Sequence, residues 1–133
     1  MIRLGLCCQF QDHPVKFVTT TATSLGRMSR HEALTKLNRL CMDNANALLA
    51  ALQFCAQHGI GCFRVNSQIL PIKTHPTHGY SMAELPQGDE IINSFKECGQ
   101  FAAKNKLRTC FHPDQFVVLN SPRLDVVEKS VQE

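Results

Sequence analysis

The sequence predicts an α/β protein built from about three parallel βα units, and three observations lead to that prediction. Short apolar stretches typical of strands alternate with longer stretches. In the longer stretches apolar residues recur every three or four positions, as they do on one face of a helix. The links from helix to strand are short and those from strand to helix are long. Strands that alternate with helices in this way pair in parallel, with the helices as crossovers.

The first unit consists of a strand at Ile2–Cys8, a threonine-rich loop over residues 9–28 and a long helix. Ser29 and Glu32 are spaced as in a capping box, in which the serine caps the first turn and the glutamate reaches back. We expect the helix to end at His58-Gly59, because glycine readily adopts the left-handed conformation that terminates helices. Its apolar face is formed by Leu34, Leu37, Cys41, Ala45, Leu48, Leu52 and Cys55.

The second unit has a strand at Gly61–Asn66, a long connection over residues 67–88 and a helix whose N-cap is expected at Asp89. Connections of this length inside a compact domain are usually functional. The third unit follows the same order, with a strand at Leu107–Phe111, a loop at His112–Asn120 and a helix opened by Ser121 and Pro122.

Two histidines lie at matching places in the second and third units. His75 is in the loop after the second strand, His112 directly follows the third strand, and a proline follows each. Strand-to-helix loops all open at the carboxyl ends of parallel strands, where active sites are found. Proline biases the preceding residue to an extended conformation, so each imidazole is held rigidly where it can bind a metal. For either histidine alone a loop hydrogen bond is the simpler interpretation, and for the pair metal ligation is equally good.

Four other residues of these units are candidates for contacts with nucleic acid. Arg64 and Lys73 flank the same loops and are suited to phosphate, although ordinary salt bridges explain them equally well. Gln115 beside Phe116 is typical of a pair that enters a base stack. From the residues alone, however, Phe116 as part of the core is the simpler interpretation.

Composition places the chain among globular proteins without assigning a partner. The net charge of +3, from 14 basic and 11 acidic residues, is compatible with nucleic acid but too small to imply it. Apolar runs are only a few residues long, which predicts no membrane span and no signal peptide. The seven cysteines include no CxxC pair, so we expect reduced, buried thiols and a cytoplasmic location.

Two stretches resemble strand motifs of the UV damage endonucleases. Phe63–Pro76 is similar to the second-strand motif and Leu107–Phe116 to the third-strand motif, and the opening Ile2–Gly5 and the tail Asn120–Pro122 are similar as well. The resemblance runs in order through essentially the whole chain. It implies that residues 1–133 form a single partial domain, the N-terminal part of a (β/α)8 TIM-type barrel like that of endonuclease IV.

The resemblance also implies a function, that of a DNA repair endonuclease acting on damaged double-stranded DNA. Such enzymes nick the phosphodiester backbone on the 5′ side of a UV photoproduct. Divalent metal ions, manganese or zinc, activate water and neutralise charge on the phosphate. By motif match, His75 and His112 are metal ligands, and Gln115 and Phe116 probe the lesion. Family members often have tyrosine at the place of Phe116, which would keep the stacking but add a hydroxyl group.

The chain is too short for the complete barrel that this expected function requires. A complete barrel needs eight strands and ~250 residues. The other metal ligands and the catalytic residues are therefore expected beyond Glu133, so the metal site is incomplete and we expect this chain to be inactive without the missing C-terminal part. Two alternatives remain open, a truncated DNA-binding remnant without catalysis and a TIM-type metal-dependent enzyme related to sugar isomerases. The Gln115-Phe116 loop favours DNA over sugar.

Overall fold

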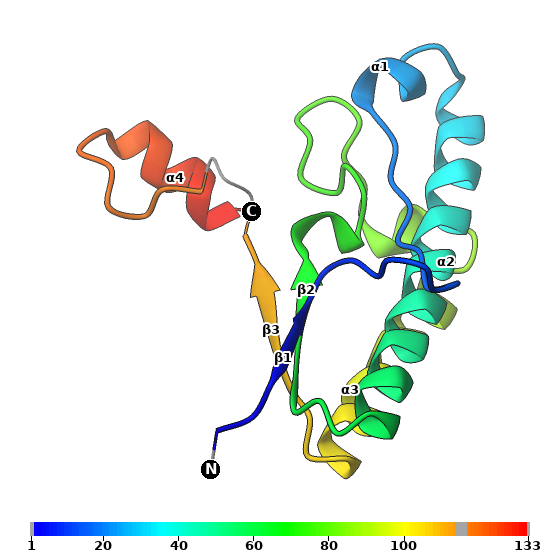
Figure 1. The fold of residues 1–133 in the computed structure, drawn as a ribbon. Coiled ribbons are helices and arrows are strands. Elements are labelled where there is room, and N and C mark those ends of the chain that lie inside the picture. Colours follow the sequence, from blue (N-terminus) through cyan, green and yellow to red (C-terminus); the bar gives the residue numbers. More distant parts are fainter. Residues whose placement is uncertain (1, 114–116, 133) are drawn as a thin grey trace.

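The computed structural model describes residues 2–113 and 117–132, which form three parallel strands and the helices that follow them. The strands lie side by side in the order β1-β2-β3, as predicted (Figure 1). In the register, Arg64 pairs with Cys110 and Asn66 with His112. The elements are β1 (Gly5–Cys7), α1 (Ala22–Leu25), α2 (Arg30–Gln57), β2 (Cys62–Asn66), the 3-10 turns η1 (Ser67–Ile69) and η2 (Met82–Glu84), α3 (Gly88–Lys104), β3 (Arg108–His112) and α4 (Leu124–Gln132).

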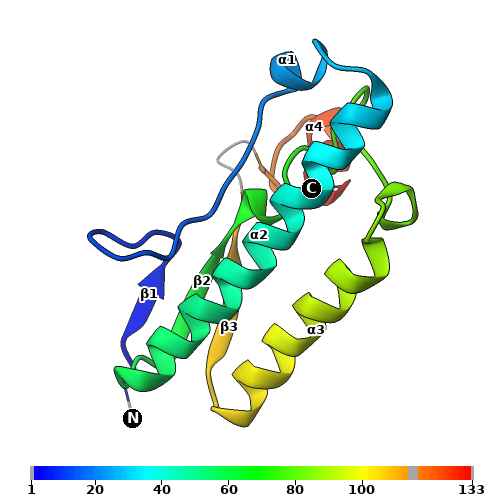
Figure 2. The same ribbon diagram turned by 90° about the vertical axis from the view of Figure 1, so that its right-hand side faces the viewer.

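The two long helices cover the same face of the sheet. Figure 2 shows α2 and α3 side by side in front of the strands, and Figure 1 shows the same layer edge-on. A doubly wound sheet reverses its strand order and carries helices on both faces, whereas a TIM-type barrel keeps sequential strands inside one ring of helices. The sequential order, with α2 and α3 on one face, is consistent with a partial barrel.

The helix α2 forms as the sequence predicts. The Ser29 side chain accepts a hydrogen bond from the Glu32 backbone N–H, and the Glu32 carboxylate accepts one from the Ser29 N–H. The helix ends at His58, and Gly59 follows with a φ of 68°. Its buried residues pack against Phe63 and Val65 of β2 and against α3.

The other helices correct the sequence-based boundaries. The loop after β1 contains a short helix, α1, capped by Thr21. Helix α3 begins at Gly88 with Gln87 as its N-cap, so the N-cap expected at Asp89 was wrong. A side chain at position 88 would overlap the Met82 carbonyl, so only glycine fits at the first residue of the helix. Helix α4 begins at Leu124 rather than directly after Ser121 and Pro122.

Helix α4 does not join the layer of α2 and α3. It lies beyond the opposite face of the sheet, near the carboxyl ends of the strands (Figure 1). On the helix side, an apolar groove of about 530 Å³ is open between α3 and β3. Phe95, Thr109 and Phe111 are among the residues that line this groove, and Phe111 is 68% exposed.

Candidate functional site at the carboxyl ends of the strands

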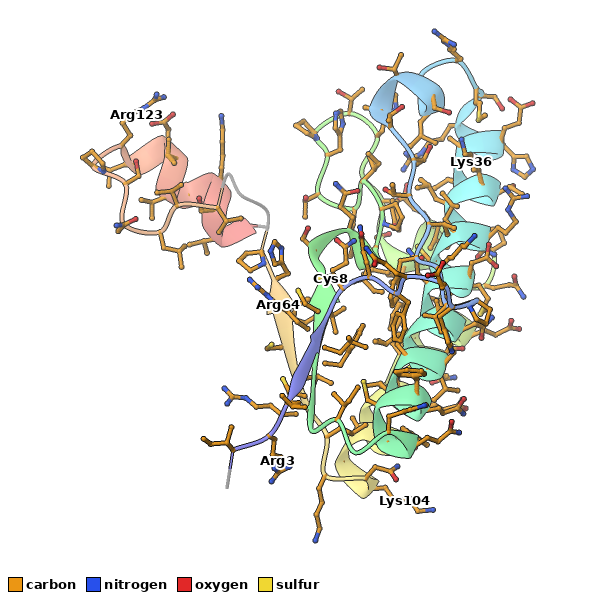
Figure 3. All side chains as sticks on the ribbon, in the orientation of Figure 1. Arg3, Cys8, Lys36, Arg64, Lys104 and Arg123 are labelled. Atoms are coloured by element: carbon orange, nitrogen blue, oxygen red, sulfur yellow. The ribbon has the colours of Figure 1, made fainter. Side chains whose placement is uncertain are left out.

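Alternation along β2 decides which side chains face away from the helices. Phe63 and Val65 are buried beneath α2, so Arg64 and Asn66 lie on the other face. Figure 3 shows Arg64 on the side of the sheet away from α2 and α3. In a TIM-type barrel this face is the interior, and its carboxyl end opens toward the substrate.

His112 lies on this face as well. It is the last residue of β3, half-buried and in register with Asn66, and not the first residue of the loop as the sequence suggested. The Asn66 side-chain oxygen accepts a hydrogen bond of 3.0 Å from the Gln68 backbone N–H. The sheet thus brings Arg64, Asn66 and His112 together at adjacent positions on two neighbouring strands.

His75 is held within its own loop. Its Nδ1 accepts hydrogen bonds from the backbone N–H groups of Thr77, at 3.2 Å, and His78, at 3.1 Å. A neutral imidazole that accepts at Nδ1 carries its proton on Nε2. Ligation by His75 therefore requires a change of tautomer or a turn of the ring, and either change gives up the hydrogen bonds from Thr77 and His78.

The loop that carries His75 is fastened by two basic side chains. Lys73 Nζ donates to the Tyr80 carbonyl at 3.2 Å and lies 5.6 Å from the centre of the Tyr80 ring. Arg30 of α2 donates to the Gly79 carbonyl at 3.0 Å and pairs with Glu84 at 2.6 Å. The half-buried Lys73 therefore contacts its own loop, and the phosphate contact predicted for it stays a prediction.

The predicted lesion-probing pair, Gln115 and Phe116, lies outside the described residues. In the ranges 2–113 and 117–132, no three His, Cys, Asp or Glu side chains come together as a metal site. Ligation by His75 and His112 stays a prediction.

Asn44 is a structural residue of the site that the sequence analysis missed. This side chain of α2 is fully buried, and its Oδ1 accepts from the Val18 N–H at 2.7 Å. Its Nδ2 donates to the carbonyls of Val18, at 2.9 Å, and Ile69, at 3.0 Å. Asn44 thus joins the loop after β1 to the turn after β2. The sequence feature that could have revealed it is an asparagine, which is a poor helix former, on the apolar face of a long helix.

Four thiols on or beside the open face correct the expectation of uniformly buried cysteines. Cys7 is exposed, and Cys8, Cys62 and Cys110 are half-buried. Burial and a hydrogen bond with Cys110 raise the pKa of the Cys62 thiol. Burial, followed by the neighbouring Cys7, raises the pKa of Cys8 to about 11. The remaining three cysteines, Cys41, Cys55 and Cys98, are buried in the helix layer.

Comparisons with known proteins agree with this arrangement. The UV DNA damage endonuclease of Halalkalibacterium halodurans is 36% identical over 86% of this chain and 34% of that protein. The UV DNA damage endonuclease of Deinococcus radiodurans is 33% identical over 98% of this chain and 42% of that protein. The crystal structure of SacUVDE superposes with a TM-score of 0.77 and 27% identity, over 99% of this chain and 42% of that one.

The chain spans about two fifths or less of the length of the proteins it matches.

Within the described residues, no helix has the length and apolar character needed to cross a membrane. The family model described as "UV-endonuclease UvdE" matches residues 2–133. With three sequential parallel strands and this match along nearly its whole length, the chain belongs to the UV-endonuclease UvdE family.

Proposed function

We propose that this chain provides the first three strands of a DNA repair endonuclease that nicks damaged double-stranded DNA on the 5′ side of UV photoproducts by metal-assisted hydrolysis. The observation that carries the proposal is the family match over residues 2–133. The placement of Arg64, Asn66 and His112 on the open face, at the carboxyl end of the sheet, supports it. A cytoplasmic location fits the same proposal and stays a prediction.

The proposed roles follow from the chemistry of each side chain. The exposed Arg64 guanidinium is suited to a phosphate oxygen of the DNA backbone. Lys73 would make a similar contact only after releasing the Tyr80 carbonyl. Gln115 and Phe116 would probe the lesion, because an amide and an aromatic ring together can replace an unstacked base.

The described residues do not by themselves fit a cluster of manganese or zinc ions. No three candidate ligands converge among them, and the Nδ1 lone pair of His75 is taken by two backbone N–H groups. His112 and a reoriented His75 would supply part of a ligand set, with the remaining ligands coming from further βα units. This chain alone is therefore proposed to be inactive.

The test is a nicking assay on UV-irradiated duplex DNA with added manganese, with undamaged duplex as substrate control. Three proteins are compared: this chain, this chain joined to the remaining βα units of the D. radiodurans relative, and that relative itself. We expect nicks from the last two only. In the joined protein His112→Ala should abolish nicking, whereas His31→Ala, an exposed histidine on α2, should not. Nicking by the 133-residue chain alone would refute the proposal, as would full activity of the H112A joined protein.

A second candidate function is a DNA-binding remnant without catalysis, for which the exposed Arg64 guanidinium is a suitable phosphate contact. Binding of damaged duplex by the 133-residue chain is then measured as a function of salt, because each phosphate contact steepens the salt dependence. Arg64→Gln should weaken binding, whereas Lys104→Gln, at the opposite end of the sheet in Figure 3, should not. Activity of the joined protein would decide for the endonuclease over the remnant.

A further inference from the structure

Two consecutive cysteines at the end of β1 bring their sulfur atoms together. Cys7 is the last residue of the strand, and its Sγ lies 3.4 Å from the Sγ of Cys8. In a regular strand, consecutive side chains point to opposite faces of the sheet and stay apart. Here Cys8 has a φ of 52°, in the left-handed region, which breaks the alternation and turns its side chain back toward Cys7.

Hydrogen bonds on both sides hold this turn in place. The Cys8 N–H donates to the Arg64 carbonyl of β2 at 2.9 Å, which continues the ladder one residue beyond β1. The Gln9 N–H donates back to the Cys7 carbonyl at 2.6 Å. The left-handed conformation of a non-glycine residue is therefore maintained by its surroundings, and the close approach of the two thiols is built into the fold.

We propose that Cys7 and Cys8 form a vicinal dithiol site at which hydroperoxides are reduced and an intrachain disulfide is formed. A disulfide has a sulfur–sulfur distance of about 2.0 Å. Consecutive Cα atoms lie about 3.8 Å apart across a trans peptide, closer than in most disulfides, so the bond between Cys7 and Cys8 is strained and readily reduced again. The site is separate from the proposed nuclease chemistry, since neither thiol belongs to the predicted ligand set.

The reaction has two balanced steps. The Cys7 thiolate attacks the terminal oxygen of the hydroperoxide, the O–O bond breaks, and Cys7 becomes a sulfenic acid while the alcohol leaves. The sulfur of Cys8 then attacks the sulfur of Cys7. The S–O bond breaks, and hydroxide leaves with the Cys8 proton as water. Two thiols are oxidised by two electrons in total, the hydroperoxide is reduced to alcohol and water, and a thiol reductant reverses the change.

The surroundings assign the order of the two thiols. Cys7 is exposed and accessible to a peroxide, whereas Cys8 is half-buried. Burial raises the pKa of Cys8 to about 11, which disfavours its thiolate and leaves the exposed Cys7 as the first nucleophile. The Arg64 charge acts against this rise and stabilises the Cys8 thiolate as it forms. Cys62 and Cys110 are the competing thiol pair on the same face, but they sit on different strands out of register.

Peptide mapping tests the proposal directly. Cleavage after Arg3 and Lys16 releases residues 4–16, which contain Cys7, Cys8 and no other cysteine. After treatment with hydrogen peroxide and alkylation, we expect this peptide to be lighter by two hydrogen atoms and unalkylated. Reduction should restore double alkylation. Cys62→Ser and Cys110→Ser should leave this result unchanged, and Cys8→Ser should leave a sulfenic acid on Cys7 that dimedone traps.

Two results would overturn the proposal. In the first, peptide 4–16 is still doubly alkylated after peroxide has oxidised other cysteines, or it is found cross-linked to the peptide that contains Cys62 or Cys110. The other is disulfide formation at the same rate in the unfolded chain in urea, because the argument requires the folded turn to hold the two sulfurs together. In the wild-type chain we expect the folded protein to react several-fold faster, and this comparison needs no variant that might misfold.

Discussion

Asn44 makes three hydrogen bonds from a fully buried position, so the effect of removing it can be worked out from the structure. A typical hydrogen bond contributes about 1 kcal/mol net, and a buried group left without a partner costs about 1–3 kcal/mol. The Ile69 carbonyl is buried, whereas the backbone of Val18 is only partly so and regains some hydrogen bonding with water. Asn44→Ala should therefore lower the free energy of unfolding by about 3–5 kcal/mol.

Urea unfolding followed by circular dichroism measures this loss as a shift of the midpoint at constant slope. The matched control is Asn46→Ala, the same substitution on the same helix at an exposed position. It should change stability by less than about 0.7 kcal/mol, in the stabilising direction, because alanine is the better helix former. A second variant, Asn44→Asp, keeps the acceptor for Val18 N–H but turns an oxygen toward two carbonyls, and it should be at least as unstable as N44A.

A loss of less than about 1 kcal/mol for Asn44→Ala would refute the reasoning, because it falls below the cost of one unsatisfied buried group. Equal losses for the variants at positions 44 and 46 would also refute it, since they would assign the effect to helix propensity. Amide hydrogen exchange adds an independent measurement. The Val18 N–H should be protected in the wild-type chain and should exchange much faster in N44A.

Two further predictions concern α3 and the loop before it. Gly88→Ala should destabilise the chain by more than about 1 kcal/mol, because the new methyl group overlaps the Met82 carbonyl, whereas Gly99→Ala, with open space around it, should stabilise by about 0.5–1 kcal/mol in the same urea assay. Equal effects of the two would contradict the packing argument. Glu84 has a pKa lowered from 4.5 to about 2, chiefly by the Ser81 backbone N–H. Because the folded pKa is depressed, this stabilisation is present above 4.5 and is lost as the pH falls toward 2. Glu84→Gln should therefore shrink the fall in urea midpoint between neutral pH and about pH 3, and an unchanged fall would refute the assignment.

The elements that could be predicted from sequence are those decided by local rules. Helix α2 has its cap, its apolar face and its terminating glycine within one continuous segment. The start of α3 could not be predicted in the same way, because the Met82 carbonyl excludes any side chain at position 88 and that contact exists only after folding. The partial barrel was predicted from the resemblance of the strand motifs, and the likeness to the SacUVDE structure confirms it.

The candidate site could likewise be predicted only where local sequence rules determine it. Periodicity along β2 and β3 is enough to place Arg64 and His112 on one face once the register is known. The two backbone hydrogen bonds to His75 Nδ1 depend on the path of its loop, which spacing does not encode. The contact of Cys7 with Cys8 contradicts the alternation that a strand predicts, and only the backbone conformation at Cys8 reveals it.

The order β1-β2-β3 bears on how the protein is made. Among the described strands, β2 pairs with β1 and β3 with β2, so each pairs with the one synthesised just before it. Domains fold from the N-terminus as they are synthesised, at roughly 5–20 residues per second. These three strands can therefore pair one after another during translation, and the free edge of β1 is left for the strand that closes the barrel.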